Sequence, residues 1–302
     1  MRKTGLTAIM GAGALALALS GQALAADVPV KAAPAPATPD WDIAFGGGIM
    51  SDYIFRGITQ SNHGPSATAY FEPHYKEFYI GIAGSGIDWP SSCGTFCLNS
   101  PSAEVDFYGG WRPTVGKWSF DLGYIYYLYP HSTPAGPPNF GFTSDFQEFY
   151  AKATYAVTDA FSVGGAIYYS PNLLNYHKSS EYYELNAKYT IPSSYFPKDW
   201  GGYVSGAWGR FNVQGGPTNF SLSPVNTFGP FAIPSYTTWN IGGGFTYKVF
   251  TLDLRYSDTS LSRLGCIQFW NADANFSTSL GGWCKGAFAA KLSFDVLASQ
   301  LK

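Results

Sequence analysis

The sequence is organised in short segments in which apolar residues alternate with small or polar ones. In the segment Trp118–Tyr129, Phe120 and Leu122 share one face, whereas Asp121 and Gly123 share the other. A period of two is the period of a β-strand, and segments of about ten residues are long enough to cross a membrane as tilted strands. About twelve such segments occur in succession: Trp41–Phe55, Ser66–Tyr75, Phe78–Ile87, Ala103–Arg112, Trp118–Tyr129, Asp145–Ala156, Phe161–Ser170, Glu181–Ile191, Gly201–Phe211, Thr237–Tyr247, Thr251–Ser260 and Gly286–Leu297.

The connections between these segments alternate between long loops and mostly short turns. The long loops are 57–65, 88–102, 130–144, 171–180, 212–236 and 261–285, and the turns are 76–77, 113–117, 157–160, 192–200 and 248–250. Such an alternation, with an even number of strands, is typical of outer-membrane barrels. The predicted lipid-facing rows are apolar in nearly every segment, whereas a soluble β-sandwich keeps a solvated face. We therefore predict an all-β fold, a closed antiparallel transmembrane β-barrel of about twelve strands with long extracellular loops and short periplasmic turns.

The first residues have the pattern of a secretory signal peptide. Arg2 and Lys3 precede an apolar stretch, Leu6–Leu19, that is too short to span a bilayer as a helix. A small-residue site of the A-x-A type predicts cleavage between Ala25 and Ala26. A retained membrane anchor is the alternative, and the regular cleavage site argues against it.

The mature chain is predicted to contain a tether and one domain. Residues 26–40 are rich in alanine and proline, which favours an extended periplasmic tether without packing. Residues 41–302 form the predicted outer-membrane barrel. The expected location is therefore the cell outer membrane, reached by export through the inner membrane.

The composition fits a barrel and excludes several other classes. Aromatic residues make up 18% of the chain and charged residues only 13%, which argues against a disordered chain or a coiled coil. Mean hydropathy near zero argues against a helical membrane bundle. A formal charge of −2 leaves no basic surplus for nucleic acid. The strand ends carry aromatic residues as two predicted girdles: Trp41, Trp111, Trp118 and Trp200 beside the short turns, and Tyr127, Tyr129, Tyr169 and Trp239 beside the long loops.

Three stretches resemble the TorF family of proteobacterial porins. Residues Ser51–Gln60 read SDYIFRGITQ and resemble that family's S-D-Y-x-F-R-G-x-[ST]-Q signature. Glu104–Gly110 and Leu252–Asp258 resemble later stretches of the family, and residues 26–31 resemble the mature start of exported alphaproteobacterial proteins. The resemblance implies an outer-membrane barrel assigned as a porin. One departure is the C-terminus, which lacks the final aromatic residue of many such barrels, so the assembly machinery would read Phe294 or an internal signal.

The four cysteines lie in the long loops. An exported chain meets an oxidising compartment, so disulfides are expected. Of the three possible connectivities, Cys93 with Cys97 and Cys266 with Cys284 keeps each bridge within one loop. No histidine lies near either pair, which argues against zinc. We expect two disulfides and no metal or cofactor.

Period-two alternation places charged residues in the lumen, with ten acids nearly balanced by eight bases. The candidate pore-lining residues are Asp52, Arg56, Glu104, Asp106, Arg112, Asp121, Glu148, Lys152, Glu184, Lys188, Asp253 and Arg255. The wider inward set adds Asp42, Glu72, Asp295, Arg210, Lys248 and Lys291. Such charges either pair to hold strands in register or form a constriction that filters solutes. Asp52 and Arg56 share one motif and one face, so they are the leading candidates for a filter.

These patterns favour a porin that admits small hydrophilic solutes by passive diffusion through a narrow, weakly ion-selective lumen. The alternative is a structural or receptor barrel plugged by its large inward residues: Tyr70, Tyr108, Tyr127, Tyr150 and Tyr168. A barrel hydrolase is remote, because no G-x-S-x-G occurs and none of the four histidines has a patterned serine partner. The expected partners are outer-membrane lipid, lipopolysaccharide, small solutes and the barrel-assembly machinery. The oligomeric state stays open.

Overall fold

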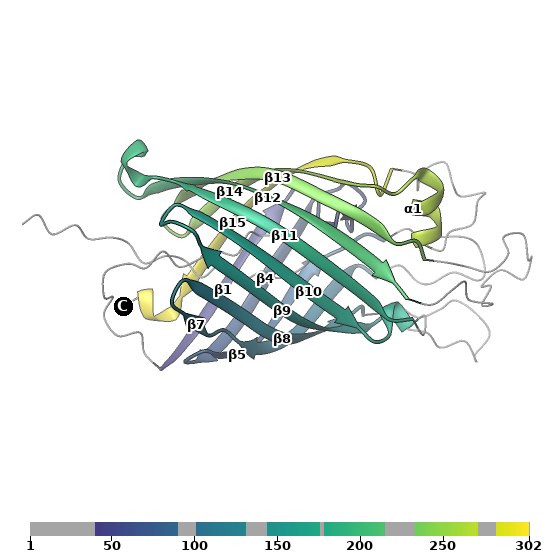
Figure 1. Ribbon diagram of the computed structural model, residues 1–302, viewed down its shortest axis with the longest axis horizontal. Coiled ribbons are helices and arrows are strands. Elements are labelled where there is room, and N and C mark those ends of the chain that lie inside the picture. The colour runs from purple at the N-terminus through teal and green to yellow at the C-terminus, as the bar shows by residue number, and fades with distance from the viewer. Residues whose placement is uncertain are drawn as a thin grey trace, which may run out of the picture.

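The computed structural model describes residues 40–89, 101–130, 144–175, 178–214, 233–270 and 282–301. Within these ranges twelve long antiparallel strands form one sheet (Figure 1). The strands are β1 (Trp41–Met50), β4 (Ser66–Tyr75), β5 (Phe78–Gly86), β6 (Ala103–Trp111), β8 (Trp118–Leu128), β9 (Phe146–Ala156), β10 (Phe161–Ser170), β11 (Ser180–Ile191), β12 (Trp200–Val213), β13 (Tyr236–Tyr247), β14 (Phe250–Thr259) and β15 (Ala287–Leu297).

The sheet closes on itself. Strand β1 pairs with β4 on one side and with β15 on the other, so the first and last strands of the wall are neighbours. Strands β6 and β8 pair directly, and a short strand β7 (Thr114–Val115) adds to the turn between them. Every long strand therefore has two partners, which satisfies the backbone groups that a bilayer cannot solvate. The predicted closed barrel is confirmed. Among the described residues no helix is long and apolar enough to cross a membrane.

Every predicted segment except the first matches one strand to within two residues at each end. The first is wrong beyond Met50, where the chain leaves the wall instead of continuing to Phe55. Ser51 makes the last hydrogen bonds to the neighbouring strand β15: its N–H donates to the carbonyl of Ala290, and its hydroxyl accepts from the Ala290 N–H. After Ser51 the chain turns into the lumen of the barrel.

The outer surface of the wall is apolar and carries aromatic residues at both ends. Trp41, Trp111, Trp118 and Trp200 are exposed beside the short turns, as predicted. At the long-loop end Tyr169 and Trp239 are exposed, but Tyr127 and Tyr129 are buried. The prediction was wrong for these last two because alternation turns them into the lumen, where their hydroxyls donate to Glu148 and Glu104.

The high glycine and tyrosine content has a packing reason in the lumen. A Cβ added at Gly81 would lie 2.2 Å from the ring of Tyr108, and one added at Gly209 would lie 2.2 Å from the hydroxyl of Tyr182. Each tyrosine ring therefore lies in the space left by a missing side chain on the neighbouring strand. This close approach requires glycine, and it lets large rings face a narrow lumen without pushing the strands apart.

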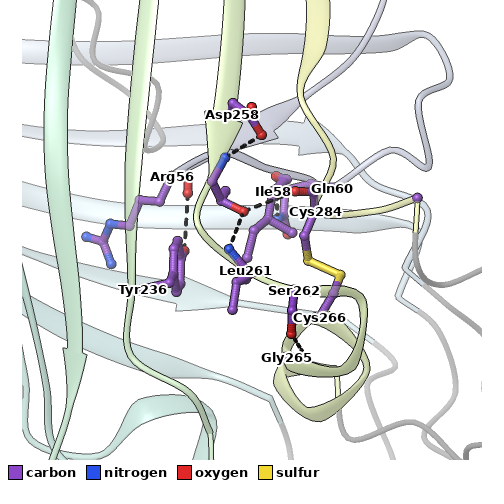
Figure 2. The surroundings of a disulfide bond; sticks show 12 residues. Arg56, Ile58, Gln60, Tyr236, Asp258, Leu261, Ser262, Gly265, Cys266 and Cys284 are labelled. Carbon is purple, nitrogen blue, oxygen red and sulfur yellow. Dashed lines mark hydrogen bonds between the residues drawn. A yellow bond between two sulfur atoms is a disulfide. The ribbon is translucent and has the colours of Figure 1, made fainter.

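A disulfide joins Cys266 to Cys284 at the long-loop end, as predicted, with Cα atoms 5.8 Å apart. Cys266 lies on helix α1 (Arg263–Phe269), which Ser262 caps by accepting from the Gly265 N–H. Figure 2 shows that the bridge ties this helix to the chain that leads into β15. Cys93, Cys97, the signal peptide with Ala25 and Ala26, and nearly all of the tether lie outside the described residues and stay predictions.

A closed barrel predicts an unusual gel mobility. We expect the detergent-folded protein to resist SDS at room temperature, because every long strand is hydrogen-bonded on both edges. Unheated samples should then migrate faster than boiled ones, and circular dichroism should show β-structure with little helix. A predominantly helical spectrum would contradict the fold.

Candidate functional site

The lumen contains a small β-hairpin of the same chain. Strands β2 (Ile54–Phe55) and β3 (Ile58–Thr59) pair antiparallel, and Arg56 and Gly57 form the turn with φ of 48° and 83°. Positive φ at both central residues is what a type I′ hairpin turn requires. We call residues 54–59 the lumen hairpin and residues 51–65 the inturned segment.

An ion pair clamps the tip of the lumen hairpin to the wall. The two terminal nitrogens of Arg56 each donate to one carboxylate oxygen of Glu148 on β9, both at 2.8 Å. The Arg56 and Glu148 side chains are only 3% and 1% exposed. Tyr127 donates a further hydrogen bond to Glu148 at 3.1 Å. A bidentate pair of this kind is among the stronger polar contacts of a protein interior.

Aromatic rings surround the same guanidinium. The Arg56 guanidinium carbon lies 4.3 Å from the centre of the Tyr182 ring and 4.9 Å from that of Tyr168. The Tyr236 hydroxyl donates to the Arg56 carbonyl at 3.2 Å, as Figure 2 shows. The hairpin tip is thus held by β9, β10, β11 and β13 together.

Asp52 and Arg56 are both buried in the lumen, but they have different partners. Because the chain turns inward after Ser51, strand alternation no longer applies to them. Asp52 instead accepts hydrogen bonds from Thr59 at 2.5 Å and Ser61 at 3.2 Å, and lies 2.8 Å from the His63 ring. It therefore holds the two ends of the inturned segment together.

Two further predicted acids, Glu104 and Asp106, are buried on strand β6 near the hairpin. Glu104 accepts from the hydroxyls of Tyr53 at 2.6 Å and Tyr129 at 2.7 Å. Asp106 has one carboxylate oxygen without a hydrogen-bond partner in the described part of the chain. Farther round the wall, Glu184 accepts from Tyr182 and from the amide of Asn186. Glu104 and Glu184 are therefore held by hydroxyl and amide donors.

A second charge network lies nearer the short-turn end. Arg112 donates to both carboxylate oxygens of Glu72, at 2.7 and 3.2 Å. Its Nε lies 3.4 Å from Asp121, and the Lys152 ammonium lies 3.4 Å from the same carboxylate. Tyr79 donates to Asp121 at 2.5 Å. Four of the predicted or wider inward charges therefore form one chain of contacts: Glu72 on β4, Arg112 in the turn after β6, Asp121 on β8 and Lys152 on β9.

A third network lies across β11, β12, β13 and β14. Arg255 donates to both carboxylate oxygens of Asp253, at 3.1 and 3.0 Å, and also to Asn240 and Ser205. Tyr203 donates to Asp253 at 2.6 Å, and the Lys188 ammonium lies 4.4 Å from the Tyr203 ring centre.

The described side chains of the lumen are partly exposed to solvent near the short-turn end and buried around the lumen hairpin. Arg112 is 22% exposed and Asp121 and Lys152 are each 17% exposed, so water enters from the short-turn end. Inward positions in the middle of the wall are also partly exposed: Ala166, Asn186, Ala207 and Asn240. Inward positions around the lumen hairpin are buried: Tyr127, Ser170, Ser180, Phe211 and Tyr236. The hairpin thus fills the long-loop end of the lumen.

The predicted lumen positions of Arg210 and Lys248 are wrong. Arg210 lies between Gly209 and Phe211, both of which face the lumen, so its side chain faces outward and binds Asn212. Lys248 lies in a short turn over the ring of Tyr247. Tyr53 and His63, for which the sequence predicts no role, contact the predicted lumen acids Glu104 and Asp52. Tyr53 belongs to the SDYIFRGITQ stretch, whereas no pattern marks His63. Asp42 lies at the short-turn end, where it accepts from Ser299.

Together these features define a transmembrane β-barrel whose lumen is filled at one end by a hairpin of its own chain. Residues 34–265 match the family described as "Bacterial protein of unknown function (Gcw_chp)", and the chain belongs to this family. That description names no activity, and the likeness to TorF porins stays a resemblance. No curated protein matches the chain.

Solved structures of low similarity include several outer-membrane proteins. The KdgM porin is 9% identical with a TM-score of 0.43, and the match covers 84% of this chain and 98% of that one. LpxR from Salmonella typhimurium is 8% identical with a TM-score of 0.44, covering 83% and 99%. An outer membrane channel from Pseudomonas putida F1 is 8% identical with a TM-score of 0.43, covering 86% and 97%. Scores of this size add nothing to what the chain's own geometry says about function.

Proposed function

We propose that this protein is a porin of the bacterial outer membrane whose pore is closed by the lumen hairpin. When the hairpin withdraws, small hydrophilic solutes diffuse through a narrow lumen with little selectivity for ions. The chain reaches the membrane as an exported protein with a cleaved signal peptide, and lipid and lipopolysaccharide surround its wall.

The observation that supports this proposal is a polar lumen whose described residues are partly exposed to water near the short-turn end. Asp121 and Lys152 line the wet part with charges of opposite sign, and Arg112 adds a further cation there. A wet, charged lining is of use to a diffusion channel. In this part of the lumen the bases Arg112 and Lys152 are paired with the acids Glu72 and Asp121, and this balance argues against strong selectivity for either cations or anions.

A second candidate is a barrel that never conducts and serves as a structural or receptor protein. The burial of Arg56, Glu148 and Tyr127 favours it, because a permanent plug needs such a dry contact. The inward tyrosines at the Tyr108 and Tyr150 positions narrow the lumen further. The two candidates differ in one property, namely whether removal of the hairpin opens a path for ions.

Planar-bilayer recording tests this difference. We compare the wild-type protein with a variant in which residues 53–60 are replaced by a short glycine–serine linker. The wild type is expected to show low conductance with long closed periods, and the hairpin-deleted variant a larger and steady conductance. Twelve strands enclose a narrower lumen than the sixteen of general porins, so even the open variant should conduct less than they do.

The matched control shortens the turn around Ser193–Tyr195, which lies outside the lumen and should leave the currents unchanged. Heat-dependent gel mobility confirms that each variant is folded before it is inserted. A folded, inserted and silent hairpin-deleted variant would defeat the porin and support the non-conducting barrel. Equal currents in the wild type and the deletion would show that the hairpin is no plug.

A further inference from the structure

The side chain of Arg210 faces outward from the wall, near the long-loop end of β12. Its neighbours Gly209 and Phe211 face the lumen, so strand alternation turns Arg210 the other way. The other outward positions of the described long strands are apolar or uncharged, apart from the acids Glu181 and Asp258. A base on this side of a barrel needs a reason, because a charge in contact with lipid chains destabilises the fold.

Arg210 lies just beyond the exposed aromatic residues of the long-loop end. Trp208 precedes it by two positions in the same outward row, and Trp239 on β13 is the register partner of Trp208. The two tryptophans are 48% and 42% exposed. Two residues along a strand span about 7 Å, so Arg210 lies on the water side of this girdle, at the level of the lipid headgroups.

Most of the donors of the Arg210 guanidinium are unused. Its Nε donates to the amide oxygen of Asn212 at 2.9 Å, and this is its one hydrogen bond within the described part of the chain. The two terminal nitrogens therefore keep their N–H groups for another acceptor. The Asn212 amide nitrogen and the hydroxyl of Thr237, which is the register partner of Arg210 on β13, lie on the same outward face as further donors.

The two outward acids do not neutralise this base. Glu181 on β11 accepts hydrogen bonds from Tyr183 at 3.0 Å and from Gln214 at 3.3 Å. Asp258 on β14 accepts from the N–H of the residue that follows it, at 2.8 Å. Among the described residues neither acid forms an ion pair with Arg210, so the positive charge has no counter-ion in contact with it on the wall.

We propose that Arg210 binds the phosphate of a lipid headgroup in the outer leaflet, and that the lipid is lipopolysaccharide. A guanidinium pairs with a phosphate through two parallel N–H···O contacts, which its terminal nitrogens are free to make. The apolar wall below Arg210 accommodates acyl chains, so a phosphate attached to such chains is held at the height of the guanidinium. This inference rests on the proposed outer-membrane location and not on conduction through the lumen.

Calorimetric titration of the detergent-folded protein with purified lipopolysaccharide tests the site. We expect Arg210→Gln to bind about tenfold more weakly than the wild type, because a charge-assisted bidentate contact is lost. Arg210→Lys keeps the charge without the paired donors and should bind with intermediate affinity. The matched control Lys198→Gln removes a positive charge from the exposed turn before β12, at the other end of the barrel, and should bind as the wild type does.

Heat-dependent gel mobility confirms that each variant is folded before it is titrated. Binding of lipopolysaccharide by folded Arg210→Gln with the affinity of the wild type would overturn the proposal. So would a loss in Lys198→Gln equal to that in Arg210→Gln, because it would trace the effect to the overall charge of the protein.

Two further titrations identify the source of the phosphate. Lipopolysaccharide stripped of its phosphates should bind the wild type as weakly as the intact lipid binds Arg210→Gln, and equal binding of both forms would overturn the phosphate contact. Inorganic phosphate should not displace the lipid, and complete displacement would point to a free ion instead. Arg210-dependent binding by a barrel that is electrically silent even without its lumen hairpin would support the lipid site and defeat the porin.

Discussion

Arg56→Ala is expected to open the pore. The substitution leaves Glu148 buried without its partner, and removing one member of a buried ion pair costs about 3 to 5 kcal/mol. Withdrawal of the lumen hairpin lets water reach Glu148 and relieves this cost, so the open state should gain roughly two orders of magnitude in population. With Arg56 gone, the Glu148 carboxylate should also shift selectivity toward cations. Conductance and reversal potential in a salt gradient measure both effects.

Arg112→Ala is the matched control for this prediction. Arg112 also binds a carboxylate with two nitrogens, but it reaches Glu72 from the turn after β6 and makes no contact with the hairpin. Its loss should lower the temperature of barrel unfolding, because it leaves the buried Glu72 without its base, and the hairpin should still close the pore. Unchanged conductance and selectivity in a folded Arg56→Ala protein would show that the clamp does not hold the pore shut.

Much of the wall could be predicted from the sequence, because each strand has one face in lipid and one in the lumen. The segments Ser66–Tyr75 and Phe161–Ser170 coincide with β4 and β10. Period-two alternation is a local signal, so it survives without knowledge of neighbouring strands. The ends of the strands could be predicted for the same reason, because the residues of the turns do not alternate between apolar and polar.

The lumen hairpin could not be predicted from the same signal. Ile54 and Phe55 continue the alternating pattern of β1, so the sequence predicts that they belong to the same wall strand. In the structure Ser51 is the last of these residues that bonds to the neighbouring strand β15. The pair Arg56-Gly57 is the one local indication, because glycine is favoured at the second central position of a type I′ turn. The same pair is equally typical of the start of a long loop, and nothing in the sequence indicates that the loop points inward.

Which lumen charges pair with each other also could not be predicted from the sequence. Arg56 and Glu148 are 92 residues apart, and their contact depends on how strands β1 and β9 are placed around a closed wall. Alternation assigns a side chain to the lumen but not to a height or a neighbour within it. Alternation can also assign a side chain to the wrong face. The prediction placed Arg210 on the inward face of β12, whereas its neighbours Gly209 and Phe211 face the lumen.

Gly57→Ala is expected to displace the lumen hairpin while leaving the Arg56–Glu148 pair chemically intact. A Cβ at Gly57 would lie 2.4 Å from the Thr238 hydroxyl oxygen and 2.5 Å from a Thr259 methyl carbon. The residue also has a φ of 83°, where a side chain costs about 1 to 2 kcal/mol before any clash. Both neighbours are short β-branched side chains on the wall, so they cannot move aside easily.

Gly116→Ala is the control that separates the cost of the positive φ from the clash inside the lumen. Gly116 has a similar φ of 63° in the turn between β7 and β8, but a Cβ there meets nothing within 4 Å. Both variants therefore carry the backbone cost, and Gly57→Ala alone carries the clash inside the lumen. We expect raised conductance and exposure of the inturned segment to a protease in Gly57→Ala, and wild-type behaviour in Gly116→Ala. Raised conductance in both would trace the effect to general loosening of the barrel, because a turn outside the lumen has no means of moving the hairpin.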